Sequence, residues 1–514
     1  MLEFSLFILL TKAEDFSGSP PLFMLNLCIG GRDNLHIKKW RCIMREASRI
    51  IMEKLKQFKQ LLVMQFTHRK RFNPAKIMML GYLAVVLIGT ALLLMPVSHQ
   101  SGEDVSVLTA LFTATSAISV TGLVVVDTVQ TWSIFGRIII LCLLQIGALG
   151  FMSFTVIFFF VMNRKIGLSH RLLIMQSIDL NDMQGVIRLI RHVLLGTFMF
   201  QTIGTIVLWI RFMPRYGIWN GLGMGVFHSV ASFANAGFDL FGYEYAFSGL
   251  SSHTGDGFIV SVTMLLAFIG GLGFFVWEDI LRSGFRFSKL HLHSKLVLSI
   301  SFWLVLFGWI FFYMAERNNS YTIGDMSLPD ALLVSLFQSI MPRSAGFSVV
   351  SQSQLMGVTR MVIMLLMLIG GSAGSSAGGI KNVTAGMLFL SAVNFFKGKS
   401  RLAVFGRTIP ASQIRSALAI TVVVLFATMI GSVTISFIQP DIPFSAVLFE
   451  TISAIATCGL SYGITGSLAP VSQMIIILFM FCGRVGIITL GMTAFLRRDT
   501  IEKTKYPDEW VMMG

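Results

Sequence analysis

The chain has 514 residues, of which 54% are hydrophobic and only 13% carry a charged side chain. A soluble globular protein carries about 25% charged residues, so the composition excludes an ordinary soluble domain. Apolar stretches of about 20 residues, the length needed to cross a hydrocarbon core, recur along the chain. They are apolar on every face, which favours helices over the alternating strands of a barrel. We therefore predict an all-α integral membrane protein.

The formal net charge of +15 is unevenly distributed and predicts the topology. Fourteen of the 40 Lys and Arg residues precede residue 77, and further clusters lie at 164–191, 282–295, 397–415 and from 497 onward. Segments rich in Lys and Arg tend to stay in the cytoplasm. We therefore predict cytoplasmic N and C termini and an even number of spans between successive basic linkers. Binding to nucleic acid is not predicted.

The first segment, 1–67, differs from the rest of the chain. It is basic, and we expect either a poorly ordered cytoplasmic extension or a true start downstream, at Met44 or Met64. The apolar residues 2–10 lack a preceding basic region, so no signal peptide is predicted. The five Cys residues are scattered and indicate neither a metal site nor a disulfide framework.

Beyond this segment the sequence predicts eight transmembrane helices in four pairs. The pairs occupy residues 68–165, 166–290, 291–400 and 401–500, and 501–514 forms a cytoplasmic tail. The first helix of each pair is predicted near 76–97, 192–212, 296–316 and 415–438. The second is predicted near 134–162, 258–281, 359–395 and 471–497.

Copies of one motif lie between the paired helices. LFTATSAISVTGL (111–123) matches LFETISAIATCGL (448–460), and weaker copies are VFHSVASFANAGF (226–238) and LFQSIMPRSAGF (336–347). Each copy ends in Gly followed by Leu or Phe, and the glycines are 115, 109 and 113 residues apart. Such a period predicts four pseudo-repeats of helix, pore half-helix, filter loop and helix around one central pore.

Each half-helix is too short to cross a bilayer, so we predict a segment that enters from outside and turns back. Non-helical backbone at membrane depth is tolerated only where it is buried or lines water. Gly in the turn permits backbone angles that let carbonyl oxygens replace the hydration shell of a cation. A lone Gly in a membrane helix usually serves packing, but four at one period favour a filter. Asp127 and Asp239 follow two turns and either attract cations or are ordinary loop acids.

The motifs TSAISVTGLVVVDT, SFANAGFDLF, PRSAGFS, GGSAGSSAGGIK, TCGLS and FCGRVGIITLG resemble the Trk/Ktr/HKT superfamily of potassium transporters, and most closely its Ktr membrane subunit. The resemblance covers about residues 68–514. It implies a selectivity filter that binds potassium at Val120, Thr121, Gly122, Leu123, Asn235, Ala236, Gly237, Phe238, Ser344, Ala345, Gly346, Phe347, Thr457, Cys458, Gly459 and Leu460. Members with Ser at a filter Gly position tend toward sodium, so Gly at all four positions favours potassium.

The same resemblance implies partners and a location that nothing in the composition predicts. These are a homodimer with one pore per subunit, set among the lipids of a bacterial cell membrane, and a cytosolic ring of nucleotide- and NAD-binding regulatory subunits of the KtrA type. No cofactor bound by this chain is expected. Potassium is the transported ion, and sodium is a candidate activator.

A run of small residues interrupts the second helix of the third repeat, which predicts a flexible loop below the filter that gates conduction. The run is Gly370, Gly371, Ser372, Ala373, Gly374, Ser375, Ser376, Ala377, Gly378 and Gly379. The alternative is tight helix packing by small residues. Arg484 lies inside an apolar run and is predicted to face the pore, or else to form a structural ion pair. Lys381 is expected to act similarly, and Arg343 to brace the third filter turn with Glu450 as partner.

The leading prediction is thus a gated, channel-like potassium uptake protein. A sodium-coupled secondary cation transporter of the same superfamily, or a sodium-permeable member, is the alternative, but the repeats share one orientation and acids at the midplane are scarce. An enzyme is not predicted, because no metal-binding, nucleophile or phosphate-binding motif is present.

Overall fold

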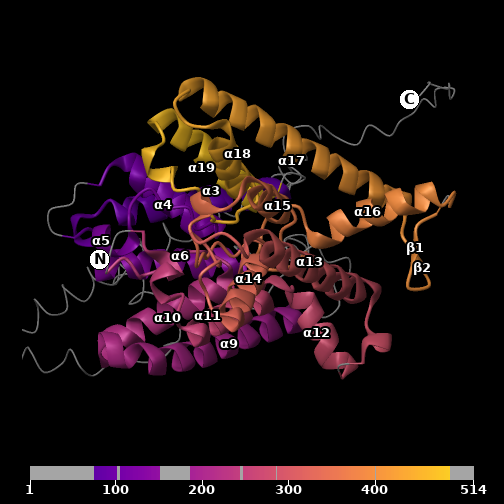
Figure 1. The fold of residues 1–514 in the computed structure, drawn as a ribbon, viewed down its shortest axis with the longest axis horizontal. Helices are drawn as coiled ribbons and strands as arrows, with labels where there is room; N and C mark the ends of the chain where they lie inside the picture. Colours follow the sequence, from indigo (N-terminus) through magenta and orange to yellow (C-terminus); the bar gives the residue numbers. More distant parts are fainter. Residues whose placement is uncertain are drawn as a thin grey trace, which may run out of the picture. The chain divides into compact units, whose positions relative to one another are not determined.

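The computed structural model describes residues 74–100, 105–150, 186–243, 247–284, 286–399 and 401–486. They belong to the compact unit Phe72–Gly514, and the predicted extension 1–67 and tail 501–514 lie outside the described residues. The described part is almost entirely helical, as predicted, with one small antiparallel hairpin of β1 (Ala403–Val404) and β2 (Arg407–Thr408) (Figure 1).

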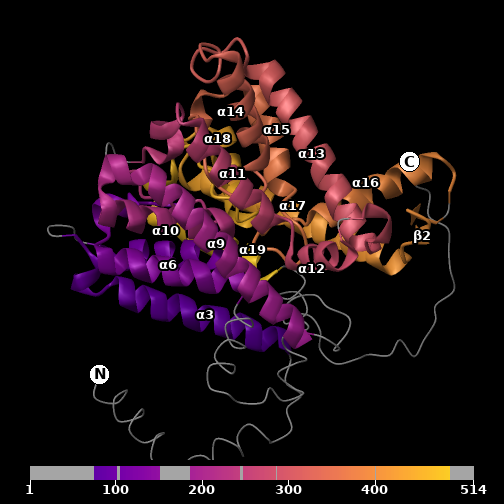
Figure 2. The ribbon, with the colours of Figure 1, turned by 90° about the horizontal axis from the view of Figure 1, so that it is seen from below.

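Long apolar helices form the outer part of this unit. They are α9 (Val186–Tyr216), α13 (Leu292–Glu316) and α17 (Ala411–Ile438). In each helix, only 28% of the 18-residue stretch that is long and apolar enough to cross a membrane is buried inside the protein. Most of its apolar surface is therefore available to lipid. The shorter apolar helices include α3 (Pro74–Leu93), which packs beside α6 (Ile134–Leu149) (Figure 2), and α19 (Pro470–Val485). The predicted helices 134–162 and 471–497 are described only as far as α6 and α19 extend.

Four short helices precede the four Gly-containing turns. They are α4 (Val107–Ser119), α10 (Ile218–Ala234), α14 (Leu328–Ile340) and α18 (Phe444–Ile455). A helix of 13 residues is about 20 Å long, well short of a hydrocarbon core of about 30 Å. Capping side chains fix two of the starts, since Ser106 and Ser327 accept hydrogen bonds from N–H groups three residues on. With 17 residues, α10 is the longest of the four.

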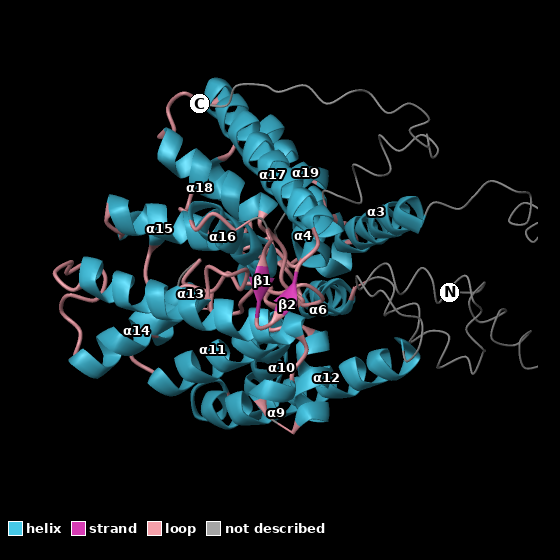
Figure 3. Ribbon diagram, turned by 90° about the vertical axis from the view of Figure 1, so that its right-hand side faces the viewer, coloured by secondary structure: helices cyan, strands magenta, loops and turns pink. Residues whose placement is uncertain are grey.

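The helices pack in a closed order. Three groups consist of α3, α4 and α6, of α9, α10 and α11, and of α17, α18 and α19, and in a fourth α13 contacts both α14 and α15 (Gly357–Leu368). Between groups, α6 contacts α10, α11 contacts α14, α15 contacts α18, and α19 contacts α4. Loops therefore gather in the middle of this arrangement, with helices around them (Figure 3).

The predicted continuous helix over 258–281 is wrong. It consists of α11 (Gly257–Gly271) and α12 (Phe274–Ser283), which are bent by 90° relative to each other. Gly273 has a φ of 94°, and a Cβ built on it would lie 2.9 Å from the Ala373 carbonyl oxygen. The helix therefore breaks where the small-residue run of the third helix pair presses against it.

The predicted interruption of the helix over 359–395 is present. α15 ends at Leu368, and α16 (Asn382–Phe396) resumes after a non-helical stretch. The remaining short elements are α5 (Thr128–Thr131) and the 3-10 helices η2 (Pro96–Ser98), η3 (Gly249–His253), η4 (Phe287–Lys289), η5 (Gln352–Gln354) and η6 (Thr465–Ser467).

Glycines allow three helices to approach the ends of the short helices. A Cβ built on Gly147, Gly270 or Gly483 would lie 2.2, 2.0 or 2.2 Å from the carbonyl oxygens of Ile118, Phe233 and Ile455, respectively. Each of these carbonyls belongs to the residue four positions before one of the periodic glycines. A side chain here would displace the backbone on which a turn is built.

We predict that Gly270→Ala destabilises the protein, because the added methyl group overlaps a backbone carbonyl that cannot move aside cheaply. Overpacking of this kind costs about 1–3 kcal/mol. Gly223→Ala is the matched control, since Gly223 also lies in a helix but has nothing within 4 Å of the added Cβ. Melting temperatures in detergent should fall for Gly270→Ala and stay level or rise for Gly223→Ala. Equal melting temperatures for the two variants would contradict the packing role.

Candidate functional site

The four turns share one backbone conformation. The periodic glycines have positive φ: 91° at Gly122, 66° at Gly237, 77° at Gly346 and 95° at Gly459. The residue two positions before each glycine also has positive φ: 57° at Val120, 58° at Asn235, 73° at Ser344 and 47° at Thr457. A non-Gly residue in this region costs about 1–3 kcal/mol and is typical of functional sites. Four such residues at equivalent positions indicate that the surrounding structure enforces this geometry.

The four turns also contact one another in a closed ring. A Cβ built on Gly122 would lie 2.2 Å from the carbonyl oxygen of Ala236 in the second turn. A Cβ built on Gly237 would lie 3.1 Å from Gly346 in the third turn. One built on Gly346 would lie 2.5 Å from the Cys458 carbonyl oxygen, and one built on Gly459 would lie 2.1 Å from the Thr121 carbonyl oxygen. Three of the glycines thus leave no room for a side chain beside a carbonyl of the next turn. All 16 residues predicted for the filter lie in these four turns.

Two serines that the sequence analysis missed hold the first and fourth turns. Ser116 Oγ accepts a hydrogen bond from the Gly122 N–H at 3.1 Å, and Ser453 Oγ accepts one from the Gly459 N–H at 3.0 Å. Both serines lie six residues before the glycine, in the Ser-Ala-Ile triplet that the two copies share. That shared triplet was the signal that could have identified them.

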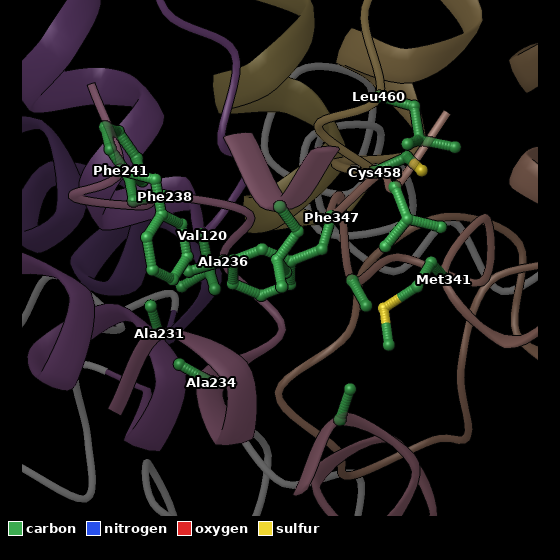
Figure 4. Packing of buried hydrophobic residues seen from close by; sticks show 14 of the residues in the cluster. Val120, Ala231, Ala234, Ala236, Phe238, Phe241, Met341, Phe347, Cys458 and Leu460 are labelled. Atoms are coloured by element: carbon green, nitrogen blue, oxygen red, sulfur yellow. The ribbon is translucent and has the colours of Figure 1, made fainter. Parts of the chain in front are cut away.

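Apolar side chains pack behind the turns. Val120, Ala236 and Phe347 belong to one buried cluster and lie close together in Figure 4. His228 on α10 contacts Phe347 with ring centroids 5.1 Å apart and forms a 2.8 Å hydrogen bond with Thr263. His228 thus contributes packing and a hydrogen bond behind the third turn. The turns are therefore supported by a rigid apolar layer.

The small-residue run closes on itself inside the protein. The Gly370 N–H donates to the Ile380 carbonyl at 2.9 Å, and the Asn382 N–H donates to the Gly371 carbonyl at 3.1 Å. We call Gly370–Gly379 the intramembrane loop. The loop also supplies hydrogen-bond partners for backbone groups at the break between α11 and α12. Its Ser372 N–H donates to the Gly271 carbonyl at 3.1 Å, and its Gly374 carbonyl accepts from the Phe274 N–H at 2.9 Å. Backbone groups left free by two broken helices thus pair with each other.

Two cations contact the intramembrane loop. The Arg484 guanidinium, near the end of α19, donates to the carbonyls of Ser376 in the loop and Gly147 near the end of α6. Lys381 Nζ donates to the Ala377 carbonyl at 2.7 Å. Among the residues that the structure describes, no ion pair includes Arg484. The partners that the structure describes for Arg484 are therefore backbone carbonyls.

The predicted partnership between Arg343 and Glu450 is wrong. Arg343 donates to the Ser301 hydroxyl at 3.0 Å. Glu450 Oε1 instead accepts hydrogen bonds from Ser461 Oγ at 2.5 Å, the Tyr462 N–H at 3.0 Å and Thr465 Oγ1 at 3.2 Å. The partners of these two buried side chains are thus hydroxyl and N–H groups, and Glu450 Oε2 and Arg343 Nε have no hydrogen-bond partner among the described residues. Through Oε1, Glu450 anchors the segment that follows the fourth turn.

Asp127 and Asp239, the two acids whose role the sequence left open, have different hydrogen-bond partners. Asp127 caps α5 by accepting from the Val129 N–H at 2.8 Å, and it also accepts from the Phe247 N–H at 2.8 Å. It therefore joins two loops and is accounted for as a structural residue. Asp239 accepts from the Phe241 N–H at 3.1 Å through one carboxylate oxygen.

We predict that Glu450→Ala lowers the melting temperature, because it leaves buried donors without an acceptor, at about 1–3 kcal/mol for each such group. Glu450→Gln is the control, since its amide oxygen can still accept the hydrogen bonds from Ser461 and Tyr462. Thermal unfolding in detergent should rank wild type above Glu450→Gln, and Glu450→Gln above Glu450→Ala. A reversed order of the two variants would show that the carboxylate does not anchor this segment.

The long apolar helices and the short helices that end at the four turns define a helical membrane protein. Residues 41–504 match the family model TrkH, described as cation transport protein, and the chain belongs to this family. Transporters, not enzymes, make up this family.

Three proteins illustrate its similarity to known relatives. The chain is 36% identical to the potassium/sodium uptake protein NtpJ of Enterococcus hirae, over 88% of this chain and 100% of that protein. It is 35% identical to the Ktr system potassium uptake protein B of Bacillus subtilis, over 86% of this chain and 97% of that protein. The fold resembles the crystal structure of the potassium transporter TrkH from Vibrio parahaemolyticus, with a TM-score of 0.68, 15% identity, and coverage of 84% of this chain and 86% of that one.

Proposed function

We propose that the chain takes up potassium through a single central pore, with the four Gly-containing turns as its selectivity filter. The observation that carries the proposal is the ring in which the turns contact one another through glycines and carbonyls. Rings of backbone carbonyls replace the hydration shell of potassium in known filters. The names of the relatives as potassium uptake proteins also support this ion.

The short helices favour a cation at the same place. α4, α10, α14 and α18 each end at or just before a turn, so their C-terminal carbonyl groups lie next to it. The C-terminal end of a helix carries about −0.5 elementary charge. Four such ends around one point stabilise a cation without any carboxylate. This agrees with the proposed four-repeat, eight-helix architecture, in which every repeat contributes one half-helix and one turn.

The intramembrane loop is the proposed gate, with Arg484 and Lys381 as its electrostatic part. Its support is the burial of Gly370–Ser372 and Ser376–Gly378, together with the two cations bound to its carbonyls. A guanidinium so close to the turns would repel an entering cation while the loop is in place. Assembly as a homodimer in the cell membrane, with a cytosolic ring of nucleotide- and NAD-binding subunits, belongs to the same proposal.

The test of the filter is ion flux into liposomes with potassium or sodium as the sole cation. We predict that Gly→Ser at a filter position lowers the ratio of potassium to sodium uptake, by about ten-fold for each 1.4 kcal/mol of lost preference. Gly122, Gly346 and Gly459 should be affected most, because a Cβ there meets a carbonyl within 2.5 Å, whereas the nearest atom to a Cβ at Gly237 is at 3.1 Å. Gly398→Ser is the control, with a φ of 66° but open space around it. Unchanged uptake ratios at all four positions would rule out the filter.

The test of the gate is Arg484→Gln. It removes the charge but keeps a donor for one carbonyl, so we predict faster potassium uptake, by about ten-fold for a barrier lowered by 1.4 kcal/mol. Arg407→Gln removes an exposed charge from the β hairpin and should leave the uptake rate unchanged. Uptake and melting temperature should be measured on the same preparation. A folded Arg484→Gln protein with wild-type or slower uptake would exclude the barrier role.

A further inference from the structure

The side chains of two proposed filter residues bind the intramembrane loop. Ser344, in the third turn, accepts a hydrogen bond from the Gly378 N–H of the loop at 2.9 Å. The same hydroxyl donates to the Thr457 carbonyl of the fourth turn at 2.8 Å. All three residues are buried. A single hydroxyl thus connects two filter turns to the loop below them.

Asn235 makes the corresponding connection from the second turn. In the amide orientation that satisfies both of its polar atoms, the nitrogen donates to the Ala267 carbonyl at 3.0 Å. The oxygen accepts from the Ser376 hydroxyl at 2.9 Å and from the Gly271 N–H at 3.1 Å. Asn235 therefore links the turn, the end of α11 and the loop. It has positive φ, which Asn tolerates better than most residues.

A third connection runs through Ser301 on α13. Its hydroxyl accepts from Arg343, next to the third turn, and from Asn382, just beyond the loop, each at 3.0 Å. Asn382 also donates to the Ser372 hydroxyl at 3.2 Å. The loop is therefore connected to the second turn through Asn235 and to the third and fourth turns through the Ser344 hydroxyl, and withdrawing it would break these hydrogen bonds together.

We propose that Asn235, Ser344 and Ser376 couple the intramembrane loop to the filter, so that the position of the loop sets the affinity of the filter for its cation. The proposal rests on the filter and gate of the proposed function, and it makes the loop a support of the filter as well as an obstruction. Since coupling of binding equilibria is reciprocal, occupancy of the filter also biases the loop. The three side chains act as positioning residues for the carbonyls.

The test compares three alanine variants in potassium uptake into liposomes. Ser376→Ala removes a contact to the second turn without changing any filter residue, and Ser344→Ala removes the bridge between loop and fourth turn. Ser375→Ala is the matched control, because the partners of its hydroxyl among the described residues lie within the loop: the Ser372 carbonyl at 2.8 Å and the Ala377 N–H at 3.2 Å. We expect Ser376→Ala and Ser344→Ala to raise the KM for potassium and lower the potassium/sodium uptake ratio by about three- to ten-fold, the range for one lost hydrogen bond. Ser375→Ala should change the maximal rate alone.

The outcomes separate this inference from the proposed function. If wild type takes up potassium selectively while Ser376→Ala retains the wild-type KM and uptake ratio, the coupling is overturned and the filter assignment stands. If Ser375→Ala shifts the KM and the uptake ratio as much as Ser376→Ala, loop stability and not contact with the filter is responsible, and the coupling is again overturned. If wild type shows no cation uptake, the proposed function itself fails. If the Ser344→Ala protein does not fold, the KM and the uptake ratio of Ser376→Ala alone decide the test.

Discussion

Every peptide group inside a membrane needs a partner within the protein, and the described structure is organised around the places where helices cannot supply one. Such places occur at the four turns, at the break between α11 and α12, and in the intramembrane loop. The break between α11 and α12 lies against the intramembrane loop, and their free N–H and carbonyl groups pair with each other. The bend after Gly271 and the interruption at Gly370 are thus two halves of one contact.

Glycine is required at these contacts mainly because of space. Gly122 and Gly459 have the positive φ that a side chain disfavours, but a Cβ there would also overlap a carbonyl oxygen of the neighbouring turn. Gly147, Gly270 and Gly483 have ordinary helical backbone and are needed only because a neighbouring backbone touches them. Backbone that approaches this closely leaves little freedom for the carbonyls of the turns.

Much of this arrangement could be predicted from the sequence, for identifiable reasons. A period near 112 residues marks Gly122, Gly237, Gly346 and Gly459 without any structural knowledge, and a run of ten small residues cannot continue an apolar helix. The bend at Gly273 was not predicted, although three glycines stand at positions 270, 271 and 273, because glycines in an apolar stretch are equally typical of tight helix packing. The link from Asn235 to Ser376 spans 141 residues and leaves no local pattern. Glu450 was assigned the wrong partner because hydroxyl and N–H donors carry no charge signal in a sequence.

Two arginines inside the protein, the half-buried Arg484 and the buried Arg343, bond to uncharged groups. Arg484 donates to the carbonyls of Ser376 and Gly147, and Arg343 donates to the Ser301 hydroxyl but leaves its Nε without a partner among the described residues, where a carboxylate would be the simplest partner. A carboxylate at this depth would neutralise the arginine and also hold a permeating cation too strongly for it to leave. Carbonyl oxygens are weaker ligands, and they are the same class of ligand that the proposed filter offers to potassium.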